Sequence, residues 1–234
     1  MPRPWTVLEN SPIEELEENV WEVAGAVPGM AIGRRMTAIK LSDGGVVVHN
    51  AICLREEEQR RLEAWGPVRY LIVPNGWHRL DAHAYAERYP DAKVLCPNAA
   101  RRRVEKVVRV DGGFDLIPSD PALTVETLDG SSSQEAVFVA RSGDRTTLVF
   151  NDTVMNFGKI PGVMGWVYDL IGSTGGPKVT PLTRMVSVSD RRALHAHLER
   201  LATLPGITRV IPGHGGIVQG AELRAGLDAI VASI

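Results

Sequence analysis

Two short apolar strands, each running into a polar turn that carries histidine, constrain this chain more than any other feature. The first covers residues 70–73 and is followed by His78 and His83. The second covers residues 209–211 and leads through a Pro-Gly turn to His214. Because ligands of open α/β sheets bind at the carboxyl ends of strands, we expect these turns to contribute to a shared site.

The composition is typical of one globular domain spanning residues 1–234, since 44% of the residues are apolar and 23% are charged. A formal net charge of −2 gives no reason to expect nucleic acid or an anionic membrane as a partner. Cys53 and Cys96 are too few for a disulfide framework. The acidic N-terminal segment lacks the apolar stretch of a signal peptide, and no apolar run is long enough for a membrane span. We therefore expect a cytoplasmic protein.

The order of predicted elements repeats in two similar halves of strands followed by α/β units. Turn residues and apolar periodicity predict strands at 20–26, 36–41, 46–50, 68–73, 93–96, 122–128, 135–141, 146–150 and 209–211, and helices at 55–65, 80–89, 99–106, 190–203 and 221–233. Ser42-Asp43-Gly44-Gly45 is typical of a hairpin turn. This order indicates an α/β/β/α sandwich, in which two mixed sheets pack together with helices outside.

Residues 154–177 form an unusual apolar excursion. They include Phe157, Trp166, Tyr168 and Leu170, while only Lys159 and Asp169 are charged. A segment of this kind is typical of ordinary core, of a lid over a site mouth or of an oligomer contact. Under the last two interpretations it is shielded from solvent, and it is the predicted route to a homo-oligomer.

A hydrolytic metal centre requires neutral imidazoles and carboxylates that converge on one point, with a coordination position left for water. Several residues of these types follow predicted strands: His49, His78, His83, Asp152 and His214. His195 and His197 lie instead within a predicted helix, where His197 flanks the apolar stripe and His195 faces solvent. We set those two aside.

The chain resembles the metallo-β-lactamase superfamily. The resemblance rests on the strand, turn and helix of residues 70–89, on Asn151-Asp152 at a strand end, and on Pro212-Gly213-His214-Gly215. Residues 35–44, Gly66-Pro-Val-Arg-Tyr and Pro74-Asn75-x-x-His78 resemble more narrowly an uncharacterised branch known as a domain of unknown function. The resemblance implies the sandwich fold, hydrolase ancestry and zinc ligands at the strand ends.

The chain departs from the ligand motif of active superfamily members. The positions of the His-x-His-x-Asp-His motif fall on Asn75, Trp77, Arg79 and Leu80, and a middle histidine position falls near Gly130-Ser131. The bridging aspartate and the final histidine match Asp152 and His214. The metal motif is therefore degenerate.

Two interpretations of this site stay open at the level of sequence. In one, His78, Asp152 and His214 hold a single divalent metal, zinc by preference, with Asp81 or His83 as a supporting residue or base. In the other, no metal is bound and Arg79 pairs with Asp152 in a pocket. That pocket includes Asn75, Trp77, Arg79 and Ser131, with Trp77 and Leu80 as an apolar wall.

The lost motif favours a non-classical or inactive member that binds a small molecule in the former active-site cleft. The alternative is a divergent mononuclear metal-dependent hydrolase that uses His78, Asp152 and His214. Metal content separates the two functions.

Overall fold

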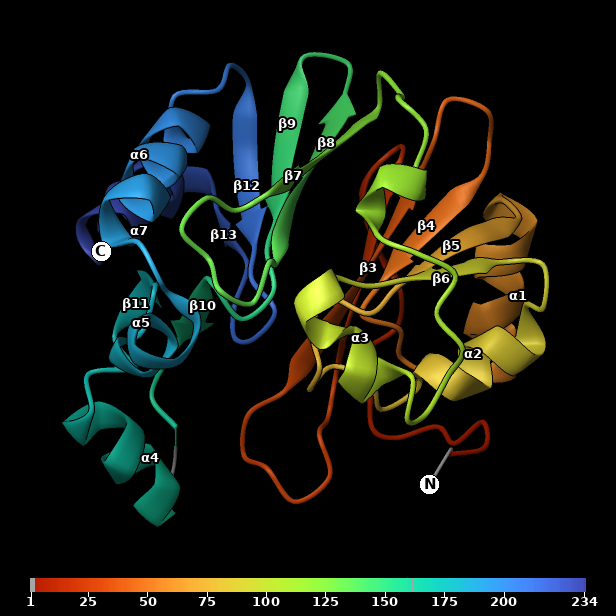
Figure 1. The fold of residues 1–234 in the computed structure, drawn as a ribbon, viewed down its shortest axis with the longest axis horizontal. Coiled ribbons are helices and arrows are strands. Elements are labelled where there is room, and N and C mark those ends of the chain that lie inside the picture. Colours follow the sequence, from red (N-terminus) through yellow and green to blue (C-terminus); the bar gives the residue numbers. More distant parts are fainter. Residues whose placement is uncertain (1–2, 161) are drawn as a thin grey trace. The chain divides into compact units, whose positions relative to one another are not determined.

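The computed structural model describes residues 3–160 and 162–234. The chain forms two compact units. The first contains the residues up to Ala26 together with Arg35–Thr124, and the second contains Val27–Arg34 together with Val125–Ile234. Each unit has its own large β-sheet with helices beside it (Figure 1). The units correspond broadly to the two predicted halves, and a single domain over residues 1–234 stays a prediction.

The first unit is built on a six-stranded mixed sheet. The strands follow the order β1-β2-β3-β4-β5-β6 across the sheet; β3 and β4 are antiparallel, whereas β4, β5 and β6 are parallel. Their bounds are β1 Glu14–Glu17, β2 Val20–Gly25, β3 Arg34–Lys40, β4 Val46–His49, β5 Val68–Ile72 and β6 Lys93–Leu95. The predicted hairpin between β3 and β4 is confirmed, and Asp43 Oδ1 accepts a hydrogen bond from the amide of Gly45 at 2.9 Å.

Three helices pack against this sheet because each contributes apolar side chains to the same core. They are α1 Glu56–Trp65, α2 Ala82–Arg88 and α3 Asn98–Val104, with a short 3-10 helix at Phe114–Leu116. Leu62, Tyr85 and Val104 lie in one buried cluster with strand residues such as Val48 and Leu71. This core holds the carboxyl end of β5, and with it the turn that contains His78.

The second unit is built on a five-stranded sheet of order β13-β12-β9-β8-β7, in which β12 and β9 are parallel and β8 and β9 are antiparallel. The strands are β7 Leu123–Thr127, β8 Ala136–Ser142, β9 Arg145–Val149, β12 Ile207–Ile211 and β13 Val218–Gln219. Helices α6 Arg191–Ala202 and α7 Leu223–Ala232 share its core through Leu194, Leu198, Leu227 and Ile230, and a 3-10 turn at Gly220–Glu222 precedes α7. Since β9 and β12 run parallel, the residues after Val149 and Ile211 emerge at the same sheet edge.

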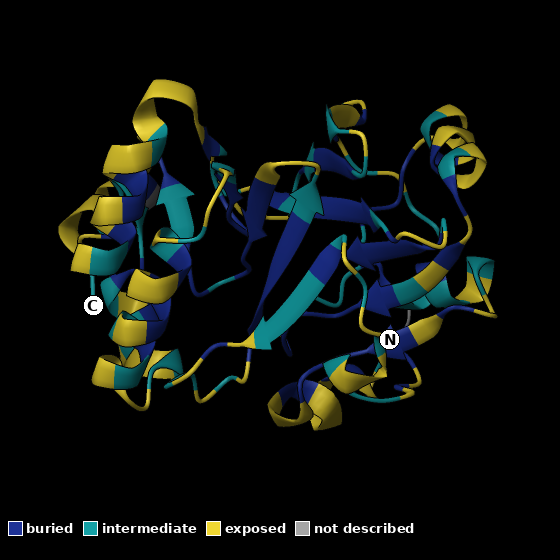
Figure 2. Ribbon diagram, turned by 90° about the horizontal axis from the view of Figure 1, so that it is seen from above, coloured by how far each residue is buried: buried dark blue, intermediate teal, exposed yellow. Residues whose placement is uncertain are grey.

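The segment between β9 and α6 contains elements that the sequence pattern did not predict. Strands β10 Met155–Phe157 and β11 Gly176–Lys178 form an antiparallel pair; helix α4 Gly162–Leu170 lies between them in the chain, and helix α5 Pro181–Ser187 follows β11. Figure 2 shows that the strands of both units are largely buried, whereas the helices carry exposed faces. No helix among the described residues is long and apolar enough to cross a bilayer.

The expectation that residues 154–177 cover a site mouth or a subunit interface stays a prediction, and part of the segment is exposed in the single chain. Trp166 is 64% exposed, and Val163 and Leu170 are also exposed. Residue 161 of this segment lies outside the described residues. Among the described residues, packing within the chain accounts for only part of the segment, such as the buried Val154 and Phe157, whereas α4 keeps an exposed apolar face.

Candidate functional site

Asp152 lies in a tight turn after β9, and buried polar groups hold this turn from both sides. Glu135, which is 2% exposed, accepts hydrogen bonds from the amide and hydroxyl of Thr153 at 2.9 and 2.8 Å. The hydroxyl of Thr183 donates to the carbonyl oxygen of Asp152 at 3.2 Å. The backbone of Asp152 is thereby fixed while its carboxylate stays partly exposed.

His214 follows β12, and the glycines beside it allow the neighbouring backbone to come close. A Cβ on Gly213 would lie 2.9 Å from the carbonyl carbon of Asn151, and one on Gly215 would lie 1.9 Å from the carbonyl oxygen of Asn156. Gly215 also has a φ of +88°, which favours glycine. The amide of Asn156 donates to the carbonyl oxygen of His214 at 3.0 Å. These contacts seat the His214 turn against the Asp152 turn.

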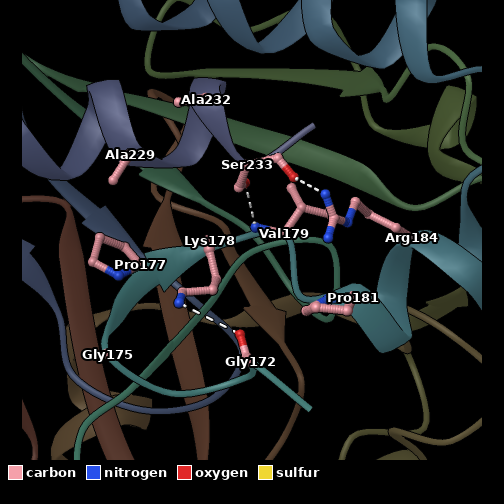
Figure 3. A pocket seen from close by; sticks show the side chains of 10 residues that line it. All are labelled: Gly172, Gly175, Pro177, Lys178, Val179, Pro181, Arg184, Ala229, Ala232 and Ser233. Carbon is pink, nitrogen blue, oxygen red and sulfur yellow. Dashed lines mark hydrogen bonds between the residues drawn. The ribbon is translucent and has the colours of Figure 1, made fainter. Parts of the chain in front are cut away.

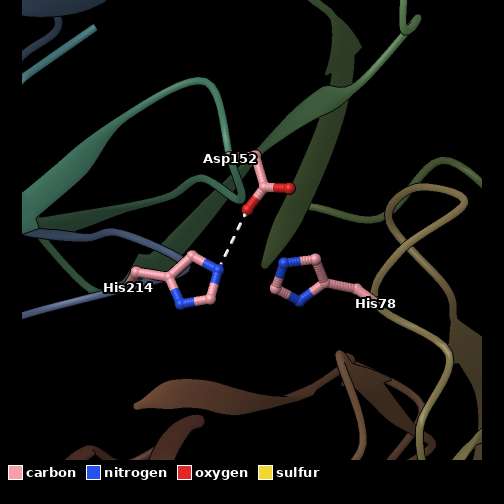
Figure 4. A group of neighbouring side chains, drawn as sticks. All are labelled: His78, Asp152 and His214. Atoms are coloured by element: carbon pink, nitrogen blue, oxygen red, sulfur yellow. Dashed lines mark ion pairs between the residues drawn. The ribbon is translucent and has the colours of Figure 1, made fainter. Parts of the chain in front are cut away.

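The imidazole of His214 is oriented by a contact at each nitrogen. Its Nε2 lies 3.2 Å from Oδ1 of Asp152 (Figure 4), and its Nδ1 lies 2.5 Å from the carbonyl oxygen of Gly33. A carbonyl oxygen only accepts hydrogen bonds, so Nδ1 carries the ring proton and donates a hydrogen bond to the carbonyl oxygen of Gly33. In the neutral ring, Nε2 is therefore the nitrogen with a free lone pair, and it faces the carboxylate.

Competing effects act on the pKa of His214. Burial acts to lower this pKa, whereas the hydrogen bond and negative charge of Asp152 and the hydrogen bond to Gly33 raise it, and the net shift is upward. Glu135 adds a smaller upward contribution. Without a bound cation, the pair is thus suited to form an ion pair between imidazolium and carboxylate.

His78 belongs to the first unit, where Asn75 shapes the turn after β5. The Oδ1 atom of the buried Asn75 accepts hydrogen bonds from the amides of Trp77 at 2.8 Å and His78 at 3.1 Å. The side chain at the first motif position therefore organises the backbone of the loop that carries His78. Figure 4 draws His78 together with Asp152 and His214.

Two of the predicted pocket residues have other roles. Trp77 is 70% exposed, and the guanidinium carbon of Arg103 lies 4.2 Å from the centre of the Trp77 ring. The place of Trp77 in an apolar pocket wall stays a prediction, since the indole is largely exposed beside a surface cation. Arg79 donates from its guanidinium to the carbonyl oxygen of Arg103. When protonated, the imidazole of His214 is a cationic partner for Asp152, and the pairing of Arg79 with Asp152 stays a prediction.

The remaining predicted site residues lie in local structural contacts. Asp81 is 1% exposed; its Oδ2 accepts a hydrogen bond from the amide of Cys53 at 3.0 Å, and its Oδ1 lies 3.7 Å from the guanidinium of Arg3. His83 lies 3.3 Å from Glu87 along α2. The hydroxyl of Ser131 lies 2.8 Å from that of Ser133. The site roles of Asp81, His83 and Ser131 stay predictions.

Sequence reasoning missed two residues that position the site. Gly33 contributes only a carbonyl oxygen, which no side-chain motif can reveal. Glu135 precedes β8 and reads as an ordinary strand-flanking acid. A buried carboxylate that binds a turn can be found only from the contacts it makes.

Comparison with solved structures identifies the fold. A metallo-β-lactamase from Pontibacter korlensis matches with a TM-score of 0.61 at 12% identity, over 96% of this chain and 98% of that chain. A metallo-β-lactamase from Hirschia baltica matches with a TM-score of 0.59 at 15% identity, over 94% and 98%. The chain has the metallo-β-lactamase fold. The predicted α/β sandwich class is thus confirmed.

No family model and no curated protein sequence matches the chain. The narrower branch of the metallo-β-lactamase fold therefore stays a prediction. Since one fold hosts many chemistries, the function of this metallo-β-lactamase-like protein has to be argued from its own side chains.

Proposed function

We propose that this protein is a divergent metal-dependent hydrolase with one divalent cation, of the zinc class, held by His78, Asp152 and His214. The observation that supports it is the orientation of His214, whose Nδ1 is bound to a backbone carbonyl while Nε2 faces a carboxylate. Histidines that ligate metals usually donate their second ring N–H to a carbonyl or carboxylate in this way.

The donor types fit a single cation of this class. Two imidazoles and one carboxylate are a combination that could hold a metal ion, and three protein ligands with one open position are typical of catalytic zinc. A bound cation would supply a Lewis acid able to activate a water molecule for hydrolysis. Trp77, Arg79 and Leu80 replace the other motif ligands, so the proposal includes no second metal.

The chain's own residues then have defined tasks. Gly33 keeps the proton on Nδ1 of His214, and Glu135 and Thr183 hold the turn of Asp152. Asn75 holds the loop that brings His78. The substrate is a small molecule, and a cytoplasmic location completes this proposal.

Metal analysis of the purified protein tests the proposal. We expect about one zinc, iron or manganese per chain as required for a mononuclear site, and its loss in His78→Ala, Asp152→Asn and His214→Ala. His83→Ala is the matched control, since its imidazole pairs with Glu87 on α2. A wild-type chain that neither contains metal nor binds added zinc in calorimetry would refute the hydrolase.

A metal-free binding protein is the second candidate. It is favoured by the upward shift of the His214 pKa, because an imidazolium can neutralise Asp152 without any metal. Under this function the former cleft binds a small molecule, and a chelator changes neither thermal stability nor ligand-induced shifts of the melting temperature. A chelator-dependent melting temperature would contradict it.

A further inference from the structure

Two helices of the second unit expose apolar side chains on one face each. In α4, Val163, Trp166 and Leu170 are 78%, 64% and 70% exposed and recur at helical spacing. In α5, Met185 and Val186 are 76% and 62% exposed. Figure 1 shows α4 apart from the five-stranded sheet of its unit. Large exposed apolar patches mark sites that bind protein or membrane.

A cavity of about 340 Å³ lies next to these helices in the chain, lined by β11, α5 and α7 (Figure 3). Its wall includes Gly172, which follows the exposed Ile171, and Pro181 and Arg184, which flank the exposed Leu182. Alanine and proline side chains form the apolar part of the wall. Residues of the cavity wall and exposed apolar residues are therefore neighbours in the sequence of this segment.

The cavity is lined by two cations that donate to backbone carbonyl oxygens. Lys178 Nζ donates to the carbonyl oxygen of Thr174 at 2.5 Å, and Arg184 donates to that of Ser233 at 2.9 Å. The Nε of Arg184 is buried without a hydrogen-bond partner among the described residues. Among the described lining residues there is no aspartate or glutamate. Donors and positive charge are thus available for an anion.

The net charge of residues 154–187 also favours an anionic ligand. Residues 154–187 contain three cations, Lys159, Lys178 and Arg184, and one carboxylate, Asp169, which gives a local charge of +2 in a chain of net charge −2. Apolar side chains that include tryptophan, with cations beside them, are the combination by which short helices bind at an anionic membrane interface.

We propose that the exposed apolar side chains of α4 and α5, together with the neighbouring cavity, dock on the surface of an anionic phospholipid bilayer. The phosphate group of one lipid enters the cavity between Lys178 and Arg184, and the exposed side chains of α4 and α5 enter the boundary between headgroups and acyl chains. Charge favours this occupant over a second copy of the chain. A two-fold contact through the same face would bring the cations of both copies together.

Vesicle co-sedimentation of the full chain tests the proposal. We expect binding to mixed phosphatidylglycerol–phosphatidylcholine vesicles, weak binding to pure phosphatidylcholine, and release at high salt. Lys178→Gln and Arg184→Gln should each weaken binding about fivefold, as removal of one cation near an anionic surface does. Arg109→Gln, which removes an exposed cation of the first unit, should leave binding unchanged.

A pair of methionine variants tests the contribution of the exposed apolar side chains to vesicle binding. Met185→Asp should abolish sedimentation with anionic vesicles, whereas Met30→Asp, at another exposed methionine of the second unit, should not. Circular dichroism checks that each variant is folded, and Trp166→Phe should remove a blue shift of tryptophan emission on vesicle binding.

Three results would overturn the proposal. One is equal binding to neutral and anionic vesicles, or none to either. Another is a dimer in light scattering that Met185→Asp dissociates, which would assign the face to a second copy. The third is stabilisation by inorganic phosphate that depends on Lys178 without any vesicle binding, which would leave a site for a free anion only.

Discussion

At the scale of single residues, the site depends on side chains that shape backbone as much as on those able to bind a metal. Asn75 stands where the superfamily motif has its first histidine, yet it holds the turn through two backbone amides. Gly213 and Gly215 occupy positions where a Cβ would clash with the neighbouring turn. Glu135 is buried and binds both the amide and the hydroxyl of Thr153.

Asn75→Ala should lower the free energy of unfolding by about 1 to 3 kcal/mol, because two amides lose their acceptor in a buried turn. Asn75→Asp keeps both acceptor contacts and should retain more of the stability. Urea denaturation measures both variants. Equal stability of wild type and Asn75→Ala would show that the hydrogen bonds of Asn75 do not hold the His78 loop.

At the scale of elements, most helices and strands begin and end near the expected residues because local signals are strong. Asp190 caps α6 by accepting hydrogen bonds from the amides of Arg192 and Ala193 at 2.9 and 3.0 Å. Within α6, His197 is buried and its Nδ1 accepts from the amide of Asp129 at 3.2 Å. This structural contact agrees with setting His197 aside as a site residue.

Asp190→Ala should cost about 1 kcal/mol of stability, as the loss of an N-cap does. Asp228→Ala is the control, since its carboxylate makes an exposed pair with Arg224 within α7, and such pairs contribute about 0.3 to 0.5 kcal/mol. Thermal denaturation distinguishes them. A larger loss for Asp228→Ala would mean that the Asp190 cap does not limit the stability of α6.

At the scale of the whole molecule, metal binding under the proposal is coupled to folding. A ligand that binds only the folded chain stabilises it by mass action. Under the proposal, zinc therefore acts on the stability of the whole chain.

Zinc at a free concentration roughly one hundred times its Kd should raise the free energy of unfolding by about 2.7 kcal/mol. The rise should vanish in His78→Ala and persist in His83→Ala. Chemical denaturation with and without zinc measures it. A rise of the same size in His78→Ala would remove His78 from the ligand set and leave Asp152 and His214 as the only protein ligands.

The sequence by itself determined the class of fold, and it named His78, Asp152 and His214 as candidate ligands, a role that stays a prediction. Hydrophobic periodicity and turn residues are local properties, so strands such as β5 and β12 and the positions of Asp152 and His214 after strands could be read from the chain. The apolar excursion was also recognised, although its helices α4 and α5 were not. Both helices are short, and α4 contains two glycines, Gly162 and Gly165, that weaken its helical pattern.

Only the tertiary structure decided what surrounds each candidate side chain. The Nδ1 of His214 binds the carbonyl of Gly33, which lies 181 residues away in the chain. Trp77 lies in the same turn as Asn75, but it is exposed and Asn75 is buried. Burial, tautomer and ion pairing depend on contacts between residues distant in sequence, and no local pattern encodes those contacts.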